Sequence, residues 1–109
     1  MSLENAIKQV RDMVAIPSVN PMGRPVSGDI YYESHLADFV ETKMKALGME
    51  IEKYEVSEGR PNVVGTLIKK GKPILLLDSH LDTVPVEGMK DPFDPVIKNN
   101  QILGRGSCD

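Results

Sequence analysis

The sequence predicts an α/β domain made of an incomplete mixed β-sheet flanked by helices. Apolar residues recur at helical spacing in two segments of the N-terminal half, and short extended segments bounded by turn formers follow them. The chain has 109 residues, which fits one small domain or a part of a larger one. Because 40% of the residues are apolar and 27% are charged, the composition is that of a folded chain.

The first helix is predicted over residues 6–14. Apolar side chains recur there three and four positions apart, with polar side chains between them (Ala6, Ile7, Val10, Met13 and Val14). The helix must end before Pro17, because a residue that precedes proline is pushed out of the helical conformation. A loop rich in turn formers follows at 18–28, and its length suggests a functional or partner-covered surface.

The second helix is predicted over residues 36–47. Its apolar stripe has the same spacing, and charged residues occupy the opposite side (Leu36, Phe39, Val40, Met44 and Leu47 against Glu41, Lys43 and Lys45). Gly48 stands where a left-handed residue ends a helix.

Extended segments are predicted at 49–56, 62–68 and 73–79. The last contains Ile-Leu-Leu-Leu at 74–77, a continuous apolar run that is typical of a strand buried on both faces of a sheet. Val96–Lys98 and Gln101–Leu103 flank two asparagines, which predicts a hairpin. No repeat or interdomain linker interrupts these elements, so the chain is at most one domain.

Composition also limits the kinds of partner. The net charge of −3 comes from scattered residues and gives no reason to expect nucleic acid. No apolar run approaches the ~18 residues that span a bilayer, and the start of the chain lacks the features of a signal peptide. A single cysteine, Cys108, excludes an internal disulfide and a CxxC metal site. We therefore expect a reduced, cytoplasmic protein without a membrane partner.

Chemically useful side chains follow the apolar run directly. His80 and Asp82 lie two positions apart, so they share a face in an extended backbone. Metal-bound histidines usually donate their second ring N–H to a carboxylate, and Asp82 fits that role. Taken by itself, a histidine after a strand is more often a structural or surface residue.

A second cluster closes the chain at 104–109, with the sequence Gly-Arg-Gly-Ser-Cys-Asp. Two glycines one residue apart allow a tight backbone that approaches its neighbours closely. Asp109 offers a hard oxygen ligand for Zn²⁺ or a similar ion, although a single loop carboxylate is more often not a ligand. The cluster is not a phosphate-binding loop, because neither glycine pattern of such loops is present.

Together the two clusters resemble the motifs of the M20 metallopeptidases, which include acetylornithine deacetylase, succinyl-diaminopimelate desuccinylase, aminoacylase and carboxypeptidase G2 types. The family pattern is a strand leading into His-x-Asp-Thr-Val-Pro, then Asp-Pro-Phe, then Gly-Arg-Gly-x-x-Asp. This chain carries the motifs in the same order at 80–85, 91–93 and 104–109. The resemblance implies that residues 1–109 are the N-terminal portion of a zinc-peptidase-like catalytic domain.

The resemblance also implies roles for three residues. His80 would bind one of two divalent ions, Asp82 would act in catalysis by orienting and polarising His80, and Asp109 would bridge both ions. Zinc is the implied metal, and cobalt or manganese also suits such ligands. The implied reaction is hydrolysis of the amide bond in a small N-acyl amino acid or peptide, by a homodimeric parent protein.

The chain departs from the family pattern because it stops at Asp109. It has no Glu-Glu pair, which supplies the family's general base, and no lid or dimerisation domain. His35 is a poor substitute ligand, since it begins the second predicted helix, where a surface role fits better. We therefore expect the parent to be the enzyme and this chain by itself to be inactive and prone to self-association. Two alternatives stay open: a truncated, non-catalytic binding or assembly module, and a small α/β domain whose His and Asp are structural.

Overall fold

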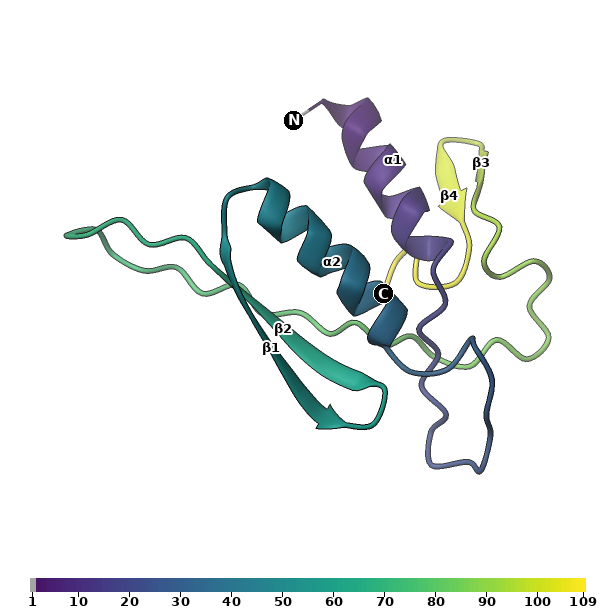
Figure 1. Ribbon diagram of the computed structural model, residues 1–109. Coiled ribbons are helices and arrows are strands. Elements are labelled where there is room, and N and C mark those ends of the chain that lie inside the picture. Colours follow the sequence, from purple (N-terminus) through teal and green to yellow (C-terminus); the bar gives the residue numbers. More distant parts are fainter. Residues whose placement is uncertain (1) are drawn as a thin grey trace.

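A computed structural model describes residues 2–109 (Figure 1). The elements in chain order are α1 (Leu3–Val14), α2 (Ser34–Ala46), β1 (Glu50–Ser57), β2 (Arg60–Thr66), β3 (Val96–Lys98) and β4 (Gln101–Leu103). The predicted α/β class is therefore confirmed. The strands form two separate antiparallel pairs, β1 with β2 and β3 with β4, where the sequence had suggested one sheet.

Both predicted helices are present, with ends that the sequence explains. The hydroxyl of Ser2 accepts a hydrogen bond from the Asn5 backbone N–H at 3.2 Å and caps the start of α1. The last residue of α1 is Val14, ahead of Pro17 as expected. After α2, Gly48 has a φ of +80°, the left-handed conformation predicted for it.

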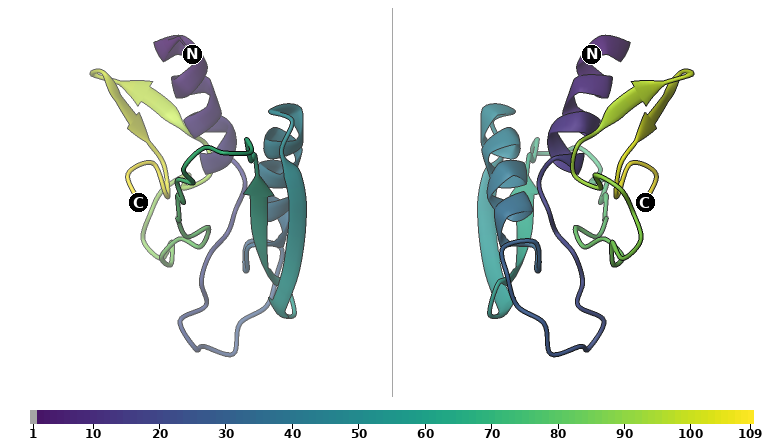
Figure 2. Two further views of the ribbon diagram at one scale, coloured as in Figure 1. Left: turned by 90° about the vertical axis from the view of Figure 1, so that its left-hand side faces the viewer. Right: turned by 90° about the vertical axis from the view of Figure 1, so that its right-hand side faces the viewer.

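Helix α2 lies against the β1–β2 hairpin (Figure 2). The strands pair from Glu50 with Thr66 to Ser57 with Arg60. Gly65 of β2 permits the close approach of α2, because a Cβ atom there would lie 2.7 Å from the Met44 sulfur. This unit forms one side of the molecule.

The β3–β4 hairpin lies beside α1 on the other side (Figure 2). Asn99 and Asn100 have φ values of +51° and +60°, the conformation that a two-residue type I′ turn requires. Asparagine adopts this conformation more readily than most residues, and the predicted hairpin is confirmed.

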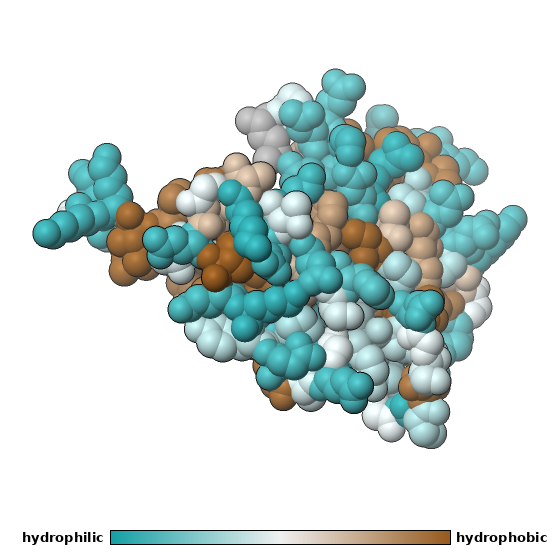
Figure 3. All heavy atoms as spheres, viewed as in Figure 1, coloured by the Kyte–Doolittle hydropathy of each residue, from teal (hydrophilic) through white to brown (hydrophobic). Residues whose placement is uncertain are grey.

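The predicted buried strand at 73–79 is wrong. These residues form no strand, and the side chains at 74–77 are 78–84% exposed. The physical reason is the lack of a pairing partner, since no strand among residues 2–109 lies alongside this segment to accept its backbone hydrogen bonds. The run belongs to an extended projection at the left of Figures 1 and 3, where hydrophobic atoms reach the surface.

The apolar core is small. Four buried hydrophobic residues define it: Val14 at the end of α1, Val19 in the following segment, and Leu36 and Ala37 on α2. The core thus draws on the end of α1, the segment that follows it and the first turn of α2. Within residues 2–109, neither helix has the length and hydrophobicity to cross a bilayer.

Candidate metal site

The segment that carries His80 is tied to the segment that follows α1. The Thr83 N–H donates to the Ser18 carbonyl at 2.9 Å, and the Asn20 N–H donates to the Thr83 carbonyl at 2.8 Å. The buried Ser18 hydroxyl adds a bond of 2.8 Å to the Leu81 carbonyl. These bonds fix the backbone beside His80, although the segments form only an isolated β-bridge.

The glycines of the 104–109 cluster bring the end of the chain to the same place. A Cβ atom on Gly104 would lie 2.5 Å from a methyl carbon of Val14, and one on Gly106 would lie 2.8 Å from the Thr83 methyl carbon. Gly106 also has a φ of +78°, which favours glycine. The close backbone approach predicted for these glycines is confirmed, and it places Asp109 beside His80.

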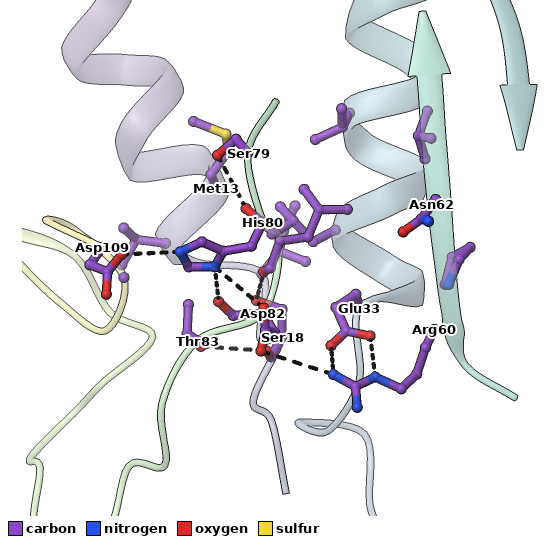
Figure 4. A pocket seen from close by; sticks show the side chains of 18 of the residues that line it. Met13, Ser18, Glu33, Arg60, Asn62, Ser79, His80, Asp82, Thr83 and Asp109 are labelled. Atoms are coloured by element: carbon purple, nitrogen blue, oxygen red, sulfur yellow. Dashed lines mark hydrogen bonds and ion pairs between the residues drawn. The ribbon is translucent and has the colours of Figure 1, made fainter. Parts of the chain in front are cut away.

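His80 and Asp109 face each other although 29 positions separate them in the chain (Figure 4). The Nε2 atom of His80 lies 3.1 Å from Oδ1 of Asp109. The other ring nitrogen, Nδ1, lies 2.8 Å from the backbone oxygen of Asp82 and 3.3 Å from its Oδ1. The site is open, because the side chains of His80 and Asp109 are 55% and 83% exposed.

The groups around His80 favour the protonated, positively charged form of its imidazole. The Asp82 backbone oxygen, and after it the Asp109 carboxylate, raise the pKa of His80 above its ordinary value. The pKa of Asp82 is lowered, chiefly because the Asn20 amide donates a hydrogen bond to it. A proton on Nε2 or a metal ion in its place would satisfy the two lone pairs that meet there.

The donor set and spacing fit one edge of a metal site. Two ligands bound at ~2.0–2.1 Å with tetrahedral angles lie roughly 3.3 Å apart, close to the observed separation of His80 Nε2 and Asp109 Oδ1. Imidazole nitrogen and carboxylate oxygen are both common zinc ligands. Among residues 2–109, no group of three or more His, Cys, Asp or Glu side chains gathers in metal-binding geometry. The structure therefore brings together two side chains of the kinds that bind zinc.

Two polar side chains near Asp82 were not predicted from the sequence. The Asn20 amide donates to Asp82 Oδ2 at 2.7 Å. An Arg60 N–H group lies 3.9 Å from the same oxygen, while the guanidinium holds the buried Glu33 carboxylate through bonds of 2.6 and 3.0 Å. Asn20 falls in the loop that the sequence marked as functional, but no spacing rule links it to Asp82, 62 positions away.

A cavity of about 1100 Å³ adjoins these side chains. His80, Asp82 and Asp109 line it together with apolar residues of α1, α2 and β2. Cys108 also lines the cavity as an exposed free thiol. His35 is exposed on α2 and is not part of the lining, in agreement with the surface role expected for it.

Sequence comparisons relate the chain to metal-dependent hydrolases. It is 35% identical to an uncharacterized metallohydrolase of Methanocaldococcus jannaschii, over 98% of this chain and 28% of that protein. It is 31% identical to N-formyl-4-amino-5-aminomethyl-2-methylpyrimidine deformylase of Bacillus subtilis, over 97% and 25%. It is 25% identical to succinyl-diaminopimelate desuccinylase of Pelagibacter ubique, over 100% and 28%. No family model and no solved structure matches the chain.

Of these three relatives, one is named a metallohydrolase, and the other two carry the names of a deformylase and a desuccinylase. The resemblance to the M20 family, predicted from three ordered motifs, is confirmed by the same relatives. The chain spans about a quarter of the length of the curated relatives it matches, 25–28% for the three above. The metal-binding and catalytic roles of His80, Asp82 and Asp109 stay predictions. The structure adds which atoms of these residues face each other.

Proposed function

We propose that the protein to which this chain contributes is a metal-dependent hydrolase of amide bonds. The observation that carries this proposal is the approach of His80 Nε2 to Asp109 Oδ1, at 3.1 Å in an open cavity. A second support is the set of relatives, whose names describe a deformylase and a desuccinylase. Both names describe removal of an acyl group, so the proposed substrate is a small N-acylated compound, either an acyl amino acid or a short peptide.

His80 and Asp109 would hold the metal in this proposal, and Asp109 is the residue that a second ion would share. Zinc is the proposed metal, and cobalt and manganese are alternatives. Ions of this kind lower the pKa of bound water and polarise a carbonyl oxygen. Asp82 holds the His80 ring, because its oxygens lie against Nδ1 and leave Nε2 directed at Asp109. A homodimer and a cytoplasmic location complete the proposal and stay predictions.

Residues 1–109 by themselves are expected to bind metal weakly and to show no turnover. A catalytic zinc takes about three protein ligands, and the described residues bring two together. The sequence also contains no Glu-Glu pair for a general base. The activity therefore belongs to the complete gene product in this proposal.

The test measures metal content and metal-dependent hydrolysis of a panel of N-acyl amino acids by the complete gene product. We expect His80→Ala to abolish turnover and lower metal content, whereas His35→Ala, which changes the other histidine, leaves both unchanged. Asp82→Asn should keep some metal and lose ~10–100-fold in activity, the usual cost of removing such a partner. Full activity and metal content in His80→Ala would refute the proposal.

A non-catalytic binding module is the second candidate, favoured by the exposed apolar run at 74–77. The gene distinguishes the two. An open frame that encodes a Glu-Glu pair and further acidic and histidine ligands after Asp109 supports the enzyme, and an immediate stop codon supports the module.

A further inference from the structure

We propose that Asn20 is a positioning residue that fixes the Asp82 carboxylate and, through it, biases which nitrogen of His80 carries the proton. The inference deepens the proposed function and relies on it only for its catalytic meaning. The arrangement itself links Asn20, in the loop after α1, to the Asp82 carboxylate by a hydrogen bond and Asp82 to the His80 imidazole through its backbone oxygen and its Oδ1. Figure 4 shows the contacts between Asp82 and His80.

The orientation of the Asn20 amide is determined by its two neighbours. Its Oδ1 accepts a hydrogen bond from the Met22 backbone N–H at 2.8 Å, and its Nδ2 donates to Asp82 Oδ2 at 2.7 Å. A flipped amide would place an N–H against the Met22 N–H and an oxygen against a carboxylate. The backbone of Asn20 is held as well, by its bond to the Thr83 carbonyl. Asn20 is therefore fixed at both ends.

This fixed donor divides the two oxygens of Asp82 between different partners. Oδ2 is held by Asn20, so the carboxylate cannot rotate freely, and Oδ1 stays 3.3 Å from His80 Nδ1. The Asp82 backbone oxygen lies against the same nitrogen at 2.8 Å. The backbone oxygen is the hydrogen-bond partner of Nδ1, and the negative charge on Oδ1 adds to its attraction for a proton there. Together they favour a proton on Nδ1 and leave the Nε2 lone pair for a ligand.

The Asp109 carboxylate competes for that proton from the opposite side of the ring. In the neutral imidazole a proton on Nε2 would donate to Asp109 Oδ1 at 3.1 Å and would block the lone pair. The tautomer is thus set by a competition for the proton between the Asp82 oxygens at Nδ1 and the exposed Asp109 carboxylate at Nε2. Loss of the Asn20 hydrogen bond would let Asp82 Oδ1 move away from Nδ1 and should shift the proton toward Nε2.

Arg60 cannot take over the role of Asn20. It lies 3.9 Å from Asp82 Oδ2, too far for a hydrogen bond. Its nearer bonds go to Glu33, which is 6% exposed and needs them. Among the described residues, Asn20 is the side chain that donates a hydrogen bond to Asp82 Oδ2.

The test reads the tautomer of His80 from its imidazole ¹⁵N shifts in the 109-residue chain, at a pH where the His80 imidazole is neutral. The chain has two histidines, so His35 serves as an internal reference. We expect Asn20→Ala to raise the ratio of Nε2–H to Nδ1–H in His80 by about threefold or more and to leave His35 unchanged. The matched control is Asn62→Ala, which alters an exposed asparagine on β2 that lines the same cavity.

A second variant keeps the test decisive if Asn20→Ala does not fold. Asn20→Asp retains the acceptor for the Met22 N–H and removes the donor to Asp82, so the loop is preserved while the clamp is lost. An unchanged His80 tautomer ratio in a folded Asn20 variant would overturn the inference.

Zinc titration of the same proteins separates this inference from the proposed function. A shifted tautomer together with zinc binding that His80→Ala does not weaken would support the role of Asn20 and count against the metal site. Zinc binding that requires His80, with no tautomer shift in either Asn20 variant, would support the metal site and count against the role of Asn20. If both proposals hold, Asn20→Ala should weaken zinc binding by about tenfold, the lower end for partners of a ligand.

Discussion

Two neighbouring segments of the chain behave in opposite ways. Residues 74–77 are all aliphatic, yet they lie in solvent without strand partners. Residues 80–83 carry the polar side chains of the site, yet their backbone is tied to Ser18 and Asn20 by three hydrogen bonds. Hydrophobicity therefore does not order a strand where no neighbour offers backbone groups, whereas a polar segment with such a neighbour is held in place.

The largest expected effect on stability is at Val19, which supports the segment of residues 80–83. Val19 is 1% exposed and lies in the bridge between the 30–32 and 81–83 segments. We expect Val19→Ala to lower the free energy of unfolding by about 2 kcal/mol, because it leaves a cavity in a small core. Urea denaturation measures this change. Val84→Ala is the matched control, since Val84 is 53% exposed and should change little; equal losses in both variants would show that Val19 is not a core residue.

An intermediate effect is expected at the contact between His80 and Asp109. Asp109→Asn removes the carboxylate that helps to raise the pKa of His80, so this pKa should fall toward the ordinary value of 6.5. NMR titration of the His80 ring measures it. The raised pKa stabilises the fold below 6.5, and this contribution is lost as the pH rises through the folded-state pKa. In Asp109→Asn, less stability should be lost as the pH rises from 6.5 through the folded-state pKa of His80. An unchanged His80 pKa in this variant would contradict the contact between His80 and Asp109.

The smallest expected effect on stability is in the exposed run. Leu75 is 81% exposed, so Leu75→Ser should change the free energy of unfolding by no more than about 0.5 kcal/mol. The same change should reduce self-association of the chain, because it interrupts an exposed apolar segment. Urea denaturation and sedimentation at several concentrations measure the two effects. A loss comparable to that of Val19→Ala would mean that the run is buried in solution.

The elements that the sequence predicted correctly are those that local chemistry determines. Apolar spacing defined both helices, Gly48 marked the end of the second, and the two asparagines marked the β3–β4 turn. The strand at 73–79 was predicted wrongly because an apolar run signals burial but does not supply a partner. The separation of the strands into two sheets has the same origin, since pairing depends on contacts distant in the chain.

The site shows a similar division. His80, Asp82 and Asp109 were selected from their motifs, and the structure places them together. Asn20 and the Arg60–Glu33 pair were missed, because hydrogen bonds across 62 and 27 positions leave no periodic trace in one sequence. The candidate site residues lie in recognisable motifs, and the residues that contact Asp82 from distant parts of the chain become visible only after folding.

The approach of His80 to Asp109 has a thermodynamic consequence. A cation shared by these side chains would cross-link the chain and close a loop of 29 positions. Because the unfolded chain does not bring these side chains together, the ion would bind the folded state preferentially and stabilise it by mass action. With so few residues in the core, binding of the ion and folding would become coupled equilibria, so that a chelator would destabilise the whole molecule and not only this site.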